Sequence, residues 1–103
     1  MIIIDKADWQ IDGGIPAEVV VNHFNIVFNW LNKHNMLTED GQEELEEGID
    51  ESVSLNEELV TKEGINFLES CYDDFLKAIA KEFYGDANEN EILESIYQGY
   101  LSS

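Results

Sequence analysis

The chain has 103 residues, 44% of them apolar, which is enough for one domain with one hydrophobic core and too apolar for a disordered chain. It carries 23 Asp and Glu against five Lys and no Arg, a formal net charge of −18. This balance argues against nucleic acid and anionic membrane surfaces as partners, because phosphate binding needs Lys and Arg, and it makes a basic protein the natural complement.

Cysteine usage and the N-terminus indicate a cytoplasmic protein. Cys71 is the only cysteine, so no internal disulfide can form, which suits a reducing compartment. Residues Met1 to Ile4 are apolar, but no basic segment precedes them, and we therefore expect no signal peptide. No apolar run approaches the ~20 residues that a membrane span requires.

Residues 1–15 are expected to be an extended or irregular lead-in. Residues 2–4 (III) could form a short strand, but a lone strand has only another chain to pair with. We expect Trp9 and Ile11 to pack onto the core, and residues 12–14 (DGG) to form a turn.

The central element is a helix predicted over residues 16–35. Pro16 suits a first helical turn, and Glu18 places a negative charge near the positive end of the helix dipole. Apolar side chains and two histidines cover most of its circumference: Val19, Val20, His23, Phe24, Ile26, Val27, Phe28, Trp30, Leu31 and His34. Such a helix should be mostly buried, with other elements packed around it.

The remaining polar stripe of this helix is either a solvated edge or a carboxamide surface for a partner: Asn22, Asn25, Asn29, Asn32 and Lys33.

A second helix is predicted over residues 39–52, with Thr38 as its N-cap. Gly41 and Gly48 weaken it by ~1 kcal/mol each relative to Ala, so this should be the least stable helix. Residues 54–60 are expected to be a loop.

The surface of this second helix is almost entirely acidic. Leu45 and Ile49 are its only apolar anchors, and eight carboxylates cover the rest: Glu39, Asp40, Glu43, Glu44, Glu46, Glu47, Asp50 and Glu51. Such a run is either a solvated face that keeps the chain soluble or a surface that attracts a cationic protein and speeds its association.

Two further helices are predicted, over residues 62–84 and 89–101. Thr61 is the N-cap of the first, and Gly85 is a natural residue to follow its C-terminus. Both helices carry an apolar stripe: Ile65, Leu68, Cys71, Tyr72, Phe75, Leu76, Ile79 and Phe83 in one, and Ile92, Leu93, Ile96, Tyr97 and Tyr100 in the other. The sequence therefore predicts a single all-α domain over residues 1–103, a compact bundle of about four helices around the buried central helix.

One segment has the spacing that opens a calcium loop: Asp86, Asn88 and Asn90. However, Glu91 replaces the required glycine, and the twelfth position is Tyr97 rather than Glu. Asn88 with Glu91 instead resembles a capping box for the last helix. We therefore expect no metal site.

The sequence shows no catalytic signature. His23 and His34 lie three turns apart on the central helix, too far to bind one metal as a local pair, so we expect core or partly buried histidines. There is no Ser-His-Asp order, glycine-rich phosphate loop or nucleophile motif, and no Arg to hold a substrate anion. We expect no enzyme, no cofactor and no small-molecule substrate.

Scattered motifs over residues 5–76 resemble a bacterial family of small acidic proteins. The family shows a D-x-A-x-W-H start, a glycine and F/I-P turn, an H-I-G-x-F-L-x-W helix with a G-L exit, and an L-x-x-E-G-N-x-F-x-x-x-Y-x-x-Y-L segment. The matching residues are Asp5-Lys6-Ala7-Asp8-Trp9-Gln10, Gly13-Gly14-Ile15-Pro16, His23-Phe24, Trp30, Met36-Leu37, Leu59, Glu63-Gly64, Asn66-Phe67, Tyr72 and Phe75-Leu76. Gln10 stands where the family has His, and Asn35 where it has Gly.

These proteins are similar to immunity proteins of contact-dependent growth-inhibition and polymorphic-toxin systems. The resemblance implies a cytoplasmic protein that binds and neutralises a cognate toxin C-terminal domain, often a nuclease. The leading hypothesis places the toxin on the acidic residues between Glu39 and Glu51. The alternatives are a nucleic-acid mimic that inhibits a host or restriction enzyme, and a structural subunit of a larger assembly.

Overall fold

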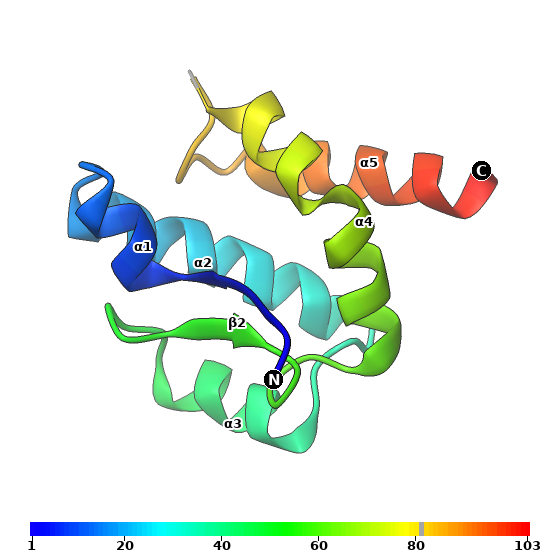
Figure 1. Ribbon diagram of the computed structural model, residues 1–103, viewed down its shortest axis with the longest axis horizontal. Coiled ribbons are helices and arrows are strands. Elements are labelled where there is room, and N and C mark those ends of the chain that lie inside the picture. The colour runs from blue at the N-terminus through cyan, green and yellow to red at the C-terminus, as the bar shows by residue number, and fades with distance from the viewer. Residues whose placement is uncertain (81) are drawn as a thin grey trace.

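Helices make up most of the chain, but a small sheet joins its beginning to its middle (Figure 1). The structure is a computed structural model that describes residues 1–80 and 82–103. Five helices and two strands are found in these residues: β1 (Ile3–Lys6), α1 (Ala7–Asp12), α2 (Ala17–Lys33), α3 (Glu39–Glu47), β2 (Ser54–Asn56), α4 (Lys62–Ile79) and α5 (Glu89–Ser102). The prediction of an all-α chain with about four helices was therefore correct for the helical bulk and wrong about the sheet and the first helix.

The two strands are antiparallel partners. Ile3 lies opposite Asn56, Asp5 opposite Leu55 and Lys6 opposite Ser54, with an irregularity between Ile3 and Asp5. The first strand thus finds its partner within the chain, in residues expected to be a loop. Sequence patterning missed it because β2 has three residues and a single apolar side chain, the buried Leu55.

The lead-in is also helical, contrary to expectation. Ala7 is fully buried and Ile11 packs against the core from the next turn of α1. Trp9 lies two residues after Ala7, which on a helix points it away from that face, and its side chain is 53% exposed rather than packed. The Lys6 ammonium lies 5.8 Å from the centre of the Trp9 ring.

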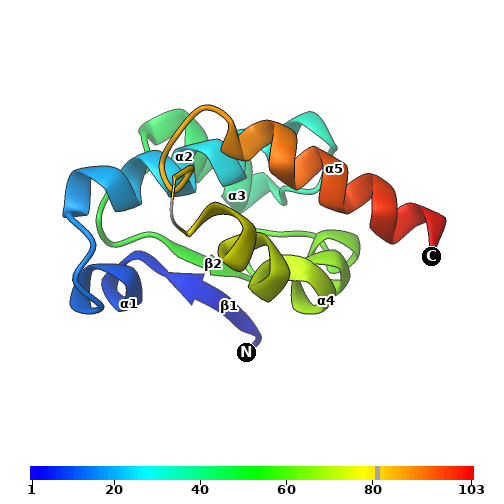
Figure 2. The same cartoon turned by 90° about the horizontal axis from the view of Figure 1, so that it is seen from above.

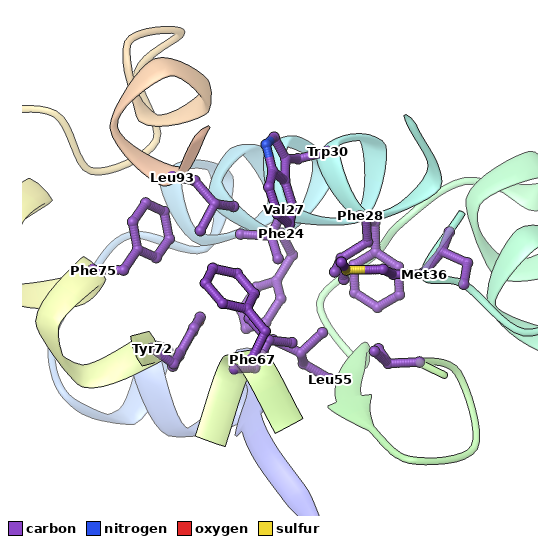
Figure 3. Packing of buried hydrophobic residues seen from close by; sticks show 14 of the residues in the cluster. Phe24, Val27, Phe28, Trp30, Met36, Leu55, Phe67, Tyr72, Phe75 and Leu93 are labelled. Carbon is purple, nitrogen blue, oxygen red and sulfur yellow. The ribbon is translucent and has the colours of Figure 1, made fainter. Parts of the chain in front are cut away.

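The central helix is α2, against which α1, α3 and α5 pack. Its apolar face is buried as predicted, with Phe24, Val27 and Phe28 fully inaccessible. Figure 3 shows these side chains meeting the buried side chains of α4 and of β2. Asn35 ends the helix in the left-handed conformation, at φ +58°, a position that asparagine tolerates well.

The acidic helix α3 is shorter than predicted. Thr38 caps it, its hydroxyl accepting a hydrogen bond from the Gly41 N–H at 3.1 Å. Gly48 adopts φ +107°, which ends the helix after Glu47 rather than at residue 52. Ile49 and Val53 are then buried from the irregular segment that follows.

The last two helices pack against each other (Figure 2). Thr61 caps α4 through the Gly64 N–H, as predicted. The helix ends at Ile79 rather than at residue 84; Lys81 lies outside the described residues, and residues 82–85 form a turn. Asn88 makes no capping bond to α5, so the capping box was wrong: its backbone N–H and its amide both donate to Asp86 Oδ1.

Candidate functional site

All eight acidic residues that were predicted to bind the toxin are exposed, but only four of them line the same hollow on the surface of α3. The four are spaced at i, i+3, i+4 and i+7, which places them on one face of the helix: Asp40, Glu43, Glu44 and Glu47. A fifth carboxylate, Glu58, joins them from the turn after β2, with Leu59 beside it. These side chains line a hollow of about 330 Å³, which we call the acidic hollow.

The turn that carries Glu58 is fixed to the start of α3. The Thr38 hydroxyl donates to the Glu58 carbonyl at 2.6 Å, and the Thr38 N–H donates to the Leu59 carbonyl at 3.0 Å. Gly41 permits the close approach, because a Cβ atom there would lie 2.0 Å from the Leu59 carbonyl oxygen. The glycine that weakens α3 in isolation is therefore what lets the helix meet this turn.

The other predicted residues lie elsewhere. Glu39 and Glu46 are exposed but do not line the acidic hollow. Asp50 and Glu51 follow the helix and line a separate shallow groove beside Val21. The Ser52 hydroxyl and N–H both donate to Asp50, and these bonds lower the pKa of its carboxyl.

Chemically, the acidic hollow offers acceptors and negative charge. No lysine is among its lining residues. In residues 1–80 and 82–103, no group of three or more His, Cys, Asp and Glu side chains has the geometry to hold a metal ion. The arrangement suits lysine and arginine side chains of another protein, whose charges would be complemented by carboxylates held close together.

The asparagine stripe of α2 is mostly solvated. Asn22, Asn29 and Asn32 are exposed and Asn25 is half-buried. The Asn29 amide donates to the Asn25 carbonyl at 2.8 Å, a local bond within the helix. This geometry fits the solvated-edge interpretation better than a prepared contact surface.

A second constellation, which the sequence did not reveal, is a buried chain of polar side chains. Tyr72 donates to Asp5 Oδ2 at 2.6 Å, His23 Nε2 lies 2.9 Å from the Tyr72 hydroxyl, and His23 Nδ1 lies 2.7 Å from Glu89 Oε1. His23 and Glu89 are fully buried and Asp5 is 3% exposed. The chain links β1, α2, α4 and α5, and we call it the polar chain.

The directions of these hydrogen bonds are fixed by the donors available. The Asp5 carboxylate accepts from the Lys6 N–H at 2.8 Å and from the Gln10 amide at 2.9 Å, so both of its oxygens act as acceptors. The Tyr72 hydroxyl is therefore the donor in its bond to Asp5. A phenol has one hydrogen, so Tyr72 must accept from His23 Nε2–H. The 2.7 Å contact between Nδ1 and Glu89 then requires a further proton between those two atoms, since two bare acceptors would repel.

The surroundings of the polar chain are those of a structural element. The Gly85 N–H donates to the second oxygen of Glu89, and the Tyr84 ring stacks on His23 with centroids 4.5 Å apart. Burial, reinforced by the Asp5 carboxylate, raises the pKa of Tyr72 well above its ordinary value. A neutral tyrosine and an enclosed histidine offer no reacting atom to solvent, so we assign the polar chain to stability.

A smaller polar contact fixes α5 on α2. Glu94 accepts from the Trp30 indole N–H at 3.0 Å and lies 2.7 Å from His34 Nε2. Its bond from the Gln98 amide and these two contacts lower the pKa of its carboxyl. Both histidines are buried or half-buried, as the sequence predicted. Their carboxylate partners, Glu89 and Glu94, were not predicted.

No family model, curated protein or solved structure matches the chain. No helix in the described residues is long and apolar enough to cross a membrane.

Proposed function

We propose that the chain is a cytoplasmic immunity protein that binds and neutralises a cognate toxin domain, a basic nuclease, by covering its substrate-binding surface with an acidic face. The observation that carries the proposal is the acidic hollow. Five carboxylates from α3 and from the turn after β2 meet there without a lysine among the lining residues.

Electrostatics explains why this surface suits such a toxin. A nuclease must bind phosphates, so its cleft presents lysine and arginine. Carboxylates spaced along one helix face can complement these cations, and the net charge of −18 draws a basic protein in from a distance. The Thr38 contacts hold the turn that carries Glu58 against the start of α3, so the fold adds a fifth carboxylate to the four on the helix.

The resemblance to immunity proteins supports the same role without locating the contact surface. Three of its matching residues, Asp5, His23 and Tyr72, belong to the polar chain, and Ala7 and Phe67 are fully buried. These matching positions therefore serve the fold, while the residues of the acidic hollow on α3 lie outside them.

The proposal predicts that an open reading frame beside the gene for this chain encodes a toxin C-terminal domain, and the test uses that domain in purified form. Association rates are measured by stopped flow at several ionic strengths for the parent, for a variant with Asp40, Glu43, Glu44 and Glu47 changed to Lys, and for a matched control. The control changes four exposed acids on other surfaces to Lys, with the same total change in charge: Glu18, Asp74, Glu82 and Glu91. Circular dichroism checks that both variants are folded.

Both variants lose long-range attraction, but only the first alters the docking surface. We expect the hollow variant to associate at least about tenfold more slowly than the control variant at physiological ionic strength. Equal rates for the two variants would show that the acidic hollow is only a solvated face. Failure of the parent to bind or inhibit the toxin would refute the proposed function.

A further inference from the structure

Exposed apolar side chains are concentrated at the start of the chain. Among the described residues, large apolar side chains with high exposure are Met1, Ile2, Ile3, Trp9 and Leu101. Four of these five precede residue 10. Scattered exposure of this kind is ordinary on a protein surface, whereas exposed apolar side chains that lie close together mark a surface for contact.

Ile2 and Ile3 border two hollows. One, of about 290 Å³, lies between Ile2, Glu57 and the start of α4, where Val60 and Ile65 contribute apolar lining. The other, of about 200 Å³, lies between residues 2–4 of the N-terminal segment and the middle of α4. Leu68 lines this second hollow, and Glu69 and Asp73 are the carboxylates on it.

Trp9 adds a large rigid side chain at the other end of β1. It follows from the geometry of α1 that this side chain is excluded from the core, and it is 53% exposed. Its polar neighbour is Lys6, whose ammonium lies over the ring. Tryptophan buries much area at little cost in conformational entropy, which is why it is enriched among the residues that dominate binding energy.

The N-terminal end of this apolar segment is attached to the turn that contributes to the acidic hollow. The Ile2 N–H donates to the Glu57 carboxylate at 3.0 Å and the Ile2 carbonyl accepts from the Glu57 N–H at 3.1 Å, so the N-terminal segment is fixed to the turn after β2. Glu58, the next residue, lines the acidic hollow. Figure 1 shows the N-terminus beside this turn.

We propose that Ile2, Ile3 and Trp9 form the apolar anchor by which the chain docks on the toxin, an inference that rests on the proposed function. The partner surface presents apolar side chains surrounded by lysine and arginine. Charge complementarity selects this occupant. Three carboxylates line the two hollows against one lysine: Glu57, Glu69 and Asp73 against Lys62. Two copies of a chain with net charge −18, by contrast, repel each other. In this arrangement the acidic hollow sets the rate of encounter, and the anchor sets the lifetime of the complex.

The experiment measures association and dissociation rates by surface plasmon resonance, with the same toxin domain as the probe. The variants are Trp9→Ala and Ile2→Ser, both at exposed positions, and the matched control is Leu101→Ala. Leu101 is 57% exposed and belongs to the last turn of α5. The C-terminal end of this helix lies away from the N-terminus in both views (Figures 1 and 2). We expect Trp9→Ala to speed dissociation at least about tenfold with association changed less than about twofold, and Leu101→Ala to change neither.

Each other outcome counts against a specific statement. If Trp9→Ala and Ile2→Ser both dissociate within about twofold of the Leu101→Ala control, the anchor is refuted while the immunity role stands. If the parent does not bind the toxin, the proposed function fails and the anchor fails with it. If sedimentation shows that the parent is a dimer that Trp9→Ala dissociates, the occupant of this surface is a second copy. Circular dichroism of each variant confirms that the fold is retained, and Ile2→Ser provides the test if Trp9→Ala does not fold.

Discussion

Replacing Glu89 by Ala should destabilise the fold more than the loss of any exposed carboxylate. Glu89 is fully buried at the start of α5, and its two oxygens face different partners. One oxygen lies 2.7 Å from His23 Nδ1, and the other accepts from the Gly85 N–H. Alanine leaves both of these groups without this acceptor, and His23 is fully buried.

The size of the effect follows from these two losses. An orphaned buried polar group costs about 1–3 kcal/mol, and removing one partner of a buried charged pair costs about 3–5 kcal/mol. We therefore expect a loss of about 3–5 kcal/mol from a domain whose total free energy of unfolding is about 5–15 kcal/mol. For a chain of this size, the melting temperature should fall by about 15–30 °C.

Urea unfolding at pH 7, followed by circular dichroism, measures this loss. The matched control is Glu91→Ala, which removes an exposed carboxylate from the same first turn of α5 and so accounts for the helix-dipole contribution. We expect the control to change the free energy of unfolding by less than about 0.5 kcal/mol. If Glu89→Ala lies within about 1 kcal/mol of the control, the polar chain does not stabilise the fold through these two bonds.

Three further predictions concern the core, the α3 contact and alkaline pH. Phe24→Ala should cost about 3–5 kcal/mol in urea unfolding by leaving a cavity; a loss below about 1 kcal/mol would contradict its complete burial. Gly41→Ala should destabilise the fold by at least about 1 kcal/mol, because the added Cβ meets a backbone carbonyl. Gly99→Ala on α5 should instead stabilise it by up to about 1 kcal/mol, because open space surrounds that position. Thermal melts in which both substitutions shift the melting temperature in the same direction would refute this reasoning. Burial and the Asp5 carboxylate raise the pKa of Tyr72 in the fold, so the folded state holds the phenol proton more tightly than the unfolded state. The resulting contribution to stability is complete below pH 10.0 and is lost as the pH rises further. The melting temperature of the parent should therefore fall above that pH more steeply than that of Tyr72→Phe.

Local signals predicted where α3 and α4 begin. Thr38 and Thr61 both cap the helices that they were expected to begin, because a hydroxyl at an N-cap needs only the N–H groups of the next turn. The apolar face of α2 follows from its spacing alone and is buried as expected.

Elements that depend on distant partners could not be predicted in this way. β2 has one apolar residue, Leu55, and pairs with a strand about fifty residues earlier, so no window of sequence contains both. Helix α1 has six residues, too few to show a period, and Trp9 was assigned to the core on its apolar character alone.

The same limit applies to the candidate site. The acidic run was evident from composition, but the separation of Asp50 and Glu51 from the acidic hollow depends on the conformation of Gly48, and the addition of Glu58 depends on contacts between two segments. The polar chain had one signal, His23 on a face that must be buried. A buried imidazole needs partners for both nitrogens, which predicts that polar groups are present without saying which ones.

The polar chain also determines when this protein can first be folded during its synthesis. Asp5 is made 67 residues before its hydrogen-bond partner Tyr72, and His23 is made 66 residues before its partner Glu89. At a translation rate of about 5–20 residues per second, each partner is made roughly 3–13 s after the residue that it completes. Until then α2 carries a histidine with both nitrogens unpaired and an apolar face without cover. The emerging chain can therefore complete the polar chain only after residue 89 has been made, and a ribosome stalled before that residue would present an unfolded, exposed segment to proteases and chaperones.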